Sequence, residues 1–173
     1  MKPELSYGLL GGAAMVAWTL AEYALGIHNT RFALGQVTGW GTEVILLVML
    51  WCLLRHQFTR LDRYWVPAWE GMLRGALASF VAGLVLYIFL NVYVLFINPE
   101  WPDLYLEWRV AQLRATGDTE DHVRMFVRSF RWMTGPAGLA LLTVGLYPLL
   151  GGVVSAGLTL WLNLRHKEPA RLG

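Results

Sequence analysis

Four long apolar runs constrain this sequence more than any other feature, because no water-exposed surface could hide them. They cover residues 5–27, 37–54, 69–97 and 138–164, and few charged side chains interrupt them. About 20 apolar residues, rising about 1.5 Å each in a helix, cross the ~30 Å hydrocarbon core of a bilayer. The runs predict an all-α fold, an integral membrane four-helix bundle that forms a single membrane domain over residues 1–173. In the fourth run, Pro148 predicts a kink.

Composition excludes two other classes of protein. Hydrophobic residues make up 56% of the chain and charged residues 15%, against roughly 45–50% and about 25% in soluble domains. Disorder requires the opposite balance, low hydrophobicity with high net charge. The net charge is only +2, and nucleic-acid binding needs a clustered basic face. We therefore expect the lipid bilayer to be a partner and nucleic acid not to be one.

The segment between the third and fourth runs, at about 100–133, has a different pattern. Its apolar residues recur at helical spacing with charged residues between them, and Gly117-Asp118 divides it in two. The second half carries Arg124, Arg128 and Arg131 on the face opposite its apolar residues. This pattern predicts two amphipathic helices that lie on the membrane or cover the bundle.

Basic residues outside the runs indicate an orientation. Lys and Arg gather at the two termini and in the polar loop 55–67, whereas the five Arg of segment 100–133 are offset by acidic residues. Cytoplasmic loops carry the excess of Lys and Arg in membrane proteins. The chain is therefore expected to be multi-pass with both termini in the cytoplasm.

Small residues recur every fourth position along the third run, at Gly71, Gly75, Ser79 and Gly83. Such a stripe lets another helix approach closely. The neighbour is either another helix of the same chain or a helix of another subunit, and the sequence leaves both interpretations open.

Two glutamates lie inside apolar runs, Glu22 in the first and Glu43 in the second. Ionisable residues within a membrane span are functional candidates. The predicted topology brings both near the same surface, where two carboxylates could share a proton or hold a cation. Alternatively, each pairs with Arg31, His28 or an arginine of the outer segment.

Glu70 and Arg74 are a candidate ion pair at the edge of the third run, because residues four apart face each other on a helix. We expect this pair to be structural. Sequence motifs of nucleotide loops, zinc sites and hydrolases are absent, and the single Cys52 forms neither a disulfide within the chain nor a multi-cysteine metal site. We therefore expect no catalytic residues, no cofactor, no metal and no enzyme activity.

The order of three spans, a helical hairpin and a fourth span resembles the bacterial domain-of-unknown-function family 4199. The residues that carry the resemblance are Trp69–Gly75, Tyr87, Tyr93, Ile97–Glu100 and the Gly117-Asp118 break. The resemblance extends over nearly the whole chain. It implies a four-span protein of the bacterial inner (cytoplasmic) membrane and supplies no activity.

These observations lead to two functional hypotheses. The first is a non-enzymatic membrane protein, a scaffold or accessory subunit that packs against other membrane subunits or itself through its small-residue faces. The alternative is a small oligomeric cation or proton transporter or channel that uses Glu22 and Glu43.

Overall fold

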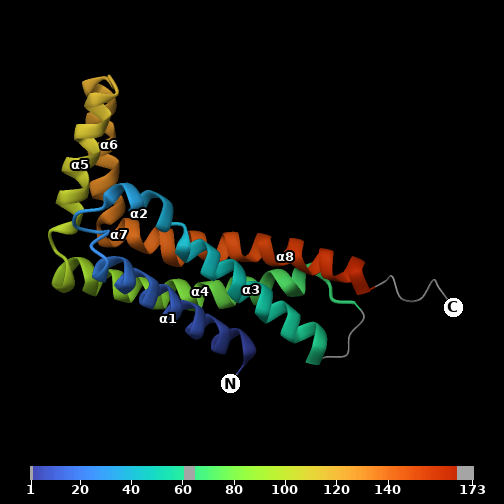
Figure 1. The fold of residues 1–173 in the computed structure, drawn as a ribbon. Helices are drawn as coiled ribbons and strands as arrows, with labels where there is room; N and C mark the ends of the chain where they lie inside the picture. Colours follow the sequence, from blue (N-terminus) through green and yellow to red (C-terminus); the bar gives the residue numbers. More distant parts are fainter. Residues whose placement is uncertain (1, 61–64, 167–173) are drawn as a thin grey trace.

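The structure is a computed structural model that describes residues 2–60 and 65–166. Within these ranges the chain forms helices and no strand, which confirms the all-α class. Four long helices run along one another (Figure 1): α1 (Pro3–Ala24), α3 (Gly41–Arg60), α4 (Ala68–Val92) and α8 (Tyr147–His166). The shorter elements are α2 (Phe32–Thr38), η1 (Tyr93–Ile97), α5 (Trp101–Ala115), α6 (Glu120–Thr134), α7 (Pro136–Ala140) and η2 (Leu141–Leu146).

Helix α4 is the centre of the bundle, and both α1 and α8 pack along it. The main core lies where α1, α3 and α4 meet, with Met15, Leu50, Leu53, Ala78 and Ala82 fully buried. Gly8 and Gly12 bring α1 close to α4, since a Cβ at either position would collide with the α4 backbone or a valine side chain. The core therefore depends on small residues as much as on large ones.

The small-residue stripe of α4 faces α8 of the same chain. A Cβ at Gly71 would collide with Thr159, one at Gly75 with Ser155, and one at Gly83 with the carbonyl of Thr143. On the other helix, a Cβ at Gly151 would collide with Ser79. From Gly71 to Ser79 each step of four along α4 is met by a step of four in the reverse direction on α8, and Gly83 then meets η2. Of the two interpretations of the stripe, the structure favours packing within the chain.

Three helical stretches are long and apolar enough to cross a membrane: Phe32–Thr59, Ala68–Ile97 and Pro136–Arg165. Helix α1 has 22 residues but is not among them, because its glycines, Glu4 and Glu22 lower its hydropathy. The first of the four predicted spans therefore stays a prediction. Many large apolar side chains of the bundle are exposed, such as Leu149 and Val153 on α8, as expected for side chains that face lipid.

Helix α3 continues to Arg60, nearly two turns beyond Leu54, where the predicted second run ends. Gln57 and Phe58 are buried, and Phe58 belongs to a small core with Leu162. This packing extends the helix into the expected loop 55–67, of which residues 61–64 lie outside the described part of the chain.

Both π-helical turns precede a proline. Turn η1 ends just before Asn98-Pro99, and the Asn98 N–H donates to the carbonyl of Tyr93 at 2.8 Å. Turn η2 ends two residues before Pro148, the position of the predicted kink. A proline has no N–H to give to the carbonyl four residues earlier, and a wider turn is one way to accommodate the change.

Helices α5 and α6 form an antiparallel hairpin within the segment predicted at about 100–133. Gly117 makes the turn between them with φ of 83°, a conformation that favours glycine. The Thr119 hydroxyl then accepts from the His122 N–H at 3.3 Å and caps α6. The hairpin leaves the end of the bundle sideways (Figure 1). Its position on a membrane surface remains a prediction.

Candidate functional site

Polar side chains gather at the end of the bundle from which the hairpin leaves. Glu22 lies in the last turn of α1 and is 6% exposed. Gly26, with φ of 72°, ends the helix and turns the chain back. This turn places His28 over the last turn of α1, with its Nε2 3.5 Å from Glu22 Oε2.

A chain of contacts continues from His28 to α4 and the segment after it. His28 Nδ1 lies 2.6 Å from the Tyr93 hydroxyl, which accepts from Asn98 Nδ2 at 3.0 Å. The same Asn98 amide donates to Asn29 Oδ1 at 2.8 Å. Because the Tyr93 hydroxyl accepts from Asn98, its proton is available for His28 Nδ1, which leaves the Nε2 proton facing Glu22.

This arrangement suits a neutral imidazole. Burial lowers the pKa of His28 below its usual range, and the adjacent Glu22 carboxylate opposes this shift only in part. At neutral pH the basic side chain beside Glu22 is then uncharged. The second oxygen, Glu22 Oε1, is buried and has no hydrogen-bond partner among the described residues.

Glu22 and Glu43 line one cavity, of about 460 Å³, between α1, α3, α4 and the start of the α7–α8 stretch. Glu43 stands in the first turn of α3, and its Oε2 accepts from the Thr42 hydroxyl at 3.0 Å. Most of the remaining lining is apolar and includes seven leucines: Leu46, Leu86, Leu90, Leu139, Leu142, Leu146 and Leu150. The structure therefore places the two candidate glutamates on one cavity.

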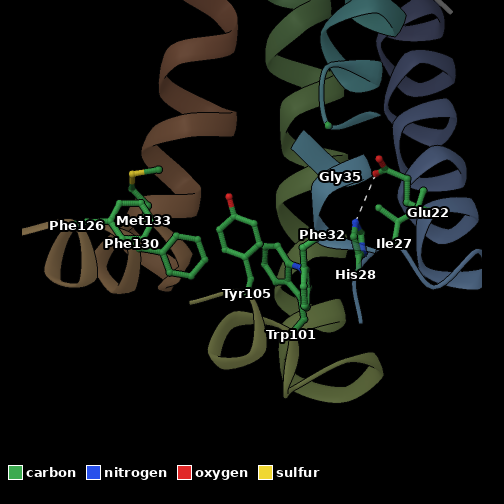
Figure 2. Close-up of a pocket in the computed structure, with 11 residues that line it drawn as sticks. Glu22, Ile27, His28, Phe32, Gly35, Trp101, Tyr105, Phe126, Phe130 and Met133 are labelled. Atoms are coloured by element: carbon green, nitrogen blue, oxygen red, sulfur yellow. Dashed lines mark ion pairs between the residues drawn. The ribbon is translucent and has the colours of Figure 1, made fainter. Parts of the chain in front are cut away.

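A second cavity, of about 370 Å³, lies between this polar site and the hairpin. Figure 2 shows His28 directed at Glu22 on one side and a row of aromatic rings leading to α6 on the other. Tyr105 and Phe130 stack with ring centroids 5.1 Å apart, and the ring centroid of Trp101 lies 5.6 Å from that of His28. Glu22, His28 and Trp101 line both cavities, so they form the wall between them.

A family model described as "Protein of unknown function (DUF4199)" matches residues 6–161. The chain belongs to the DUF4199 family. This membership confirms the resemblance drawn from the sequence. No curated protein and no solved structure matches the chain.

The other predicted pair of the DUF4199 chain lies at the opposite end of the bundle. Arg74 Nη2 lies 2.7 Å from Glu70 Oε1, and Arg74 Nη1 lies 2.9 Å from Glu4 Oε1. Glu4, which is 7% exposed, was not expected here, although an acidic residue in the first turn of an apolar helix is a usable signal. Arg74 therefore joins two acids and links α1 to α4.

Three residues of the site escaped the sequence analysis. Tyr93 is 1% exposed and was noted only as a mark of the family. Asn98 follows the end of the third apolar run and enters the prediction only through the family resemblance, and Tyr147, which lines the shared cavity, has no predicted role. Of the three, Asn98 has a usable signal, because it is a polar side chain beside a proline at the end of an apolar run.

Among the described residues, no group of three or more His, Cys, Asp and Glu side chains could hold a metal ion. What the site offers is carboxylate charge in an apolar space.

Proposed function

We propose that this DUF4199 protein is an integral membrane protein that binds an apolar organic cation in the cavity lined by Glu22 and Glu43. The observation that carries the proposal is the buried Glu22 carboxylate, whose Oε1 lacks a partner among the described residues and which shares its cavity with Glu43. A protonated amine is the simplest group to fill this position.

The charge balance supports a cationic ligand. An ionised carboxylate removed from water is costly unless a positive charge or hydrogen bonds compensate it. His28 does not supply that charge while its imidazole is neutral. A bound ammonium group supplies it.

The size and lining of the cavity support an organic molecule. Pockets for small organic ligands commonly measure roughly 300–1,000 Å³ and combine apolar walls with a few placed polar groups. The cavity between the helices has about 460 Å³ and leucine walls. The two glutamates would then fix the charged end of the ligand, and the leucines its apolar body.

Binding is tested with octylammonium, a protonated lipophilic amine, titrated by calorimetry into the full chain in detergent. We expect Glu22→Gln with Glu43→Gln to weaken binding about tenfold or more, equivalent to about 1.4 kcal/mol. Glu107→Gln, the same change at an exposed position of the hairpin, is the matched control. Equal affinity in all three proteins, or no binding by the unsubstituted chain, would contradict the proposal.

Transport is the second candidate, favoured by the same pair of glutamates on one cavity. In this version the chain is a small oligomeric cation or proton transporter or channel that uses Glu22 and Glu43. Reconstituted vesicles test it: flux that persists in Glu22→Gln and Glu43→Gln removes this candidate, whereas flux lost in both supports it.

The scaffold hypothesis has lost part of its basis. It relied on small-residue faces, and the stripe of Gly71, Gly75, Ser79 and Gly83 is packed against α8 and η2. An accessory role would need another face of the bundle. A native gel in mild detergent tests it, since a strictly monomeric protein without partners would contradict it.

For the orientation we propose four spans, with α1 as the first, both termini in the cytoplasm and the hairpin outside. The bundle supports this proposal, since the start of α1 and the end of α8 lie toward the same end (Figure 1). Labelling of a cysteine placed at Lys2 or at Thr116 in a Cys52→Ala background, in intact cells, distinguishes the two orientations.

A further inference from the structure

The hairpin carries a groove of its own, of about 460 Å³, between α5 and α6. It is separate from the cavities around Glu22. Its lining consists of three valines, one acid and four arginines: Val110, Val123, Val127, Glu120, Arg114, Arg124, Arg128 and Arg131. The groove therefore has an apolar floor and a basic edge.

Two of the four arginines already have acidic partners. Arg114 Nε donates to Glu120 Oε1 at 2.9 Å, and Arg124 pairs with Asp121. Arg128 and Arg131 are exposed, and no acidic side chain in the described part of the chain pairs with either. Their two positive charges are consequently available to an external anion.

The surroundings of the groove point to a lipid surface rather than to open water. Where the hairpin leaves the bundle sideways, α6 lies on the side turned toward α8 and α5 on the far side (Figure 1). Helix α6 also exposes three large apolar side chains, Met125 (63%), Trp132 (52%) and Met133 (40%). Exposed Trp and Met beside a row of Arg is the composition of a helix that lies in a membrane interface.

We propose that the groove between α5 and α6 binds an anionic phospholipid of the membrane on which the hairpin lies. Arg128 and Arg131 hold the headgroup phosphate, since guanidinium groups match phosphate oxygens with paired N–H donors. The valine floor takes the glycerol and upper acyl chain. The lipid thereby fixes the hairpin against the membrane surface. It also accounts for the arginines of the hairpin, which we place on the side of the membrane where loops generally carry few basic residues.

The test is native mass spectrometry of the full chain in a neutral detergent, titrated with phosphatidylglycerol or with phosphatidylcholine of the same chains. We expect phosphatidylglycerol to bind about tenfold more tightly. Arg128→Gln with Arg131→Gln should bring the two lipids within about twofold. Arg109→Gln is the matched control, because Arg109 donates to Gln112 on α5 and lies outside the groove lining.

Two further measurements separate the possible explanations of a changed lipid preference. Arg128→Lys with Arg131→Lys retains both charges and should recover most of the preference, which separates lost charge from lost folding. Inorganic phosphate at millimolar concentration should not displace the lipid. Displacement by phosphate would assign the groove to a soluble anion, and a double glutamine variant that still prefers phosphatidylglycerol would overturn the site. Equal binding of the two lipids by the unsubstituted chain would overturn it as well.

Discussion

The bundle and the hairpin are both helical, yet they use charge in opposite ways. In the bundle, Arg74 joins Glu4 and Glu70, and its side chain is 28% exposed while those of the acids are 9% and 19% exposed. In the hairpin, the Arg124 and Asp121 side chains are 75% and 85% exposed. Both are arginine–carboxylate pairs, but water screens the second far more than the first.

The reason for which glycine is required also differs between the two regions. In the bundle, Gly75 is required by close approach, because any side chain would collide with α8. In the hairpin, a Cβ at Gly117 would meet no atom within 4 Å, so the glycine is required there by its backbone conformation. The bundle is thus determined by tertiary contacts and the hairpin more by local ones, and this contrast can be measured.

The largest expected effect is that of Arg74→Met. It leaves the buried Glu4 carboxylate without the cation 2.9 Å away, and breaking a buried pair costs about 3 kcal/mol or more of unfolding free energy. Denaturant unfolding in detergent measures it. In the hairpin, Arg124→Met is the control and should cost less than about 1 kcal/mol. Equal losses of unfolding free energy in the two variants would contradict the contrast between buried and exposed ion pairs.

An intermediate effect is expected from Gly75→Ala. The added methyl group meets Ser155 and the α8 backbone, and overpacking of this kind costs about 1–3 kcal/mol. Gly157→Ala is the matched control, since a Cβ at Gly157 on α8 has nothing within 4 Å. It should gain up to about 1 kcal/mol from helix propensity. The same unfolding experiment compares both variants, and a loss at Gly157 equal to that at Gly75 would show that close contact is not what distinguishes the two positions.

The smallest expected effect concerns pH and is confined to His28. Its pKa is lower in the folded protein than in the unfolded chain, so the unfolded state binds more protons. Stability should therefore be full above about pH 6.5 and fall as the pH drops toward the folded-state pKa. Thermal melts across this range measure the slope.

Two variants sharpen the interpretation of that slope. His28→Asn should flatten the pH dependence below about pH 6.5. Glu22→Gln removes the carboxylate that favours the charged imidazole, so the pKa of His28, followed by NMR, should fall further. An unchanged slope in the first variant would place the titrating group elsewhere. A raised pKa of His28 in the second variant would contradict its interaction with the Glu22 carboxylate.

Much of the architecture could be predicted from the sequence. Apolar runs located α3, α4 and α8, and the Gly117-Asp118 break lies between the two helices of the hairpin. These features follow from local composition and helical period. The end of α3 could not be predicted in the same way, because Gln57 and Phe58 look like loop residues until the contact with Leu162 is known.

The candidate site could likewise be predicted only in part from the sequence. Glu22 and Glu43 could be chosen from the sequence because ionisable side chains are rare in apolar runs. Their shared cavity, and the chain of contacts from Glu22 through His28 and Tyr93 to Asn98, depend on residues far apart in the chain. His28 and Tyr93, for example, are separated by 65 positions. No local pattern encodes such a contact.

The sequence by itself determined that this chain is helical, apolar and a member of its family, because hydropathy and helical period are properties of consecutive residues. Only the tertiary structure decided which neighbour each special residue meets. It placed the glycine stripe of α4 against α8, gave Arg74 a second acid on α1 and left Glu22 Oε1 without a partner among the described residues. The physical reason is that close packing and ion pairing act between surfaces that the chain brings together only on folding.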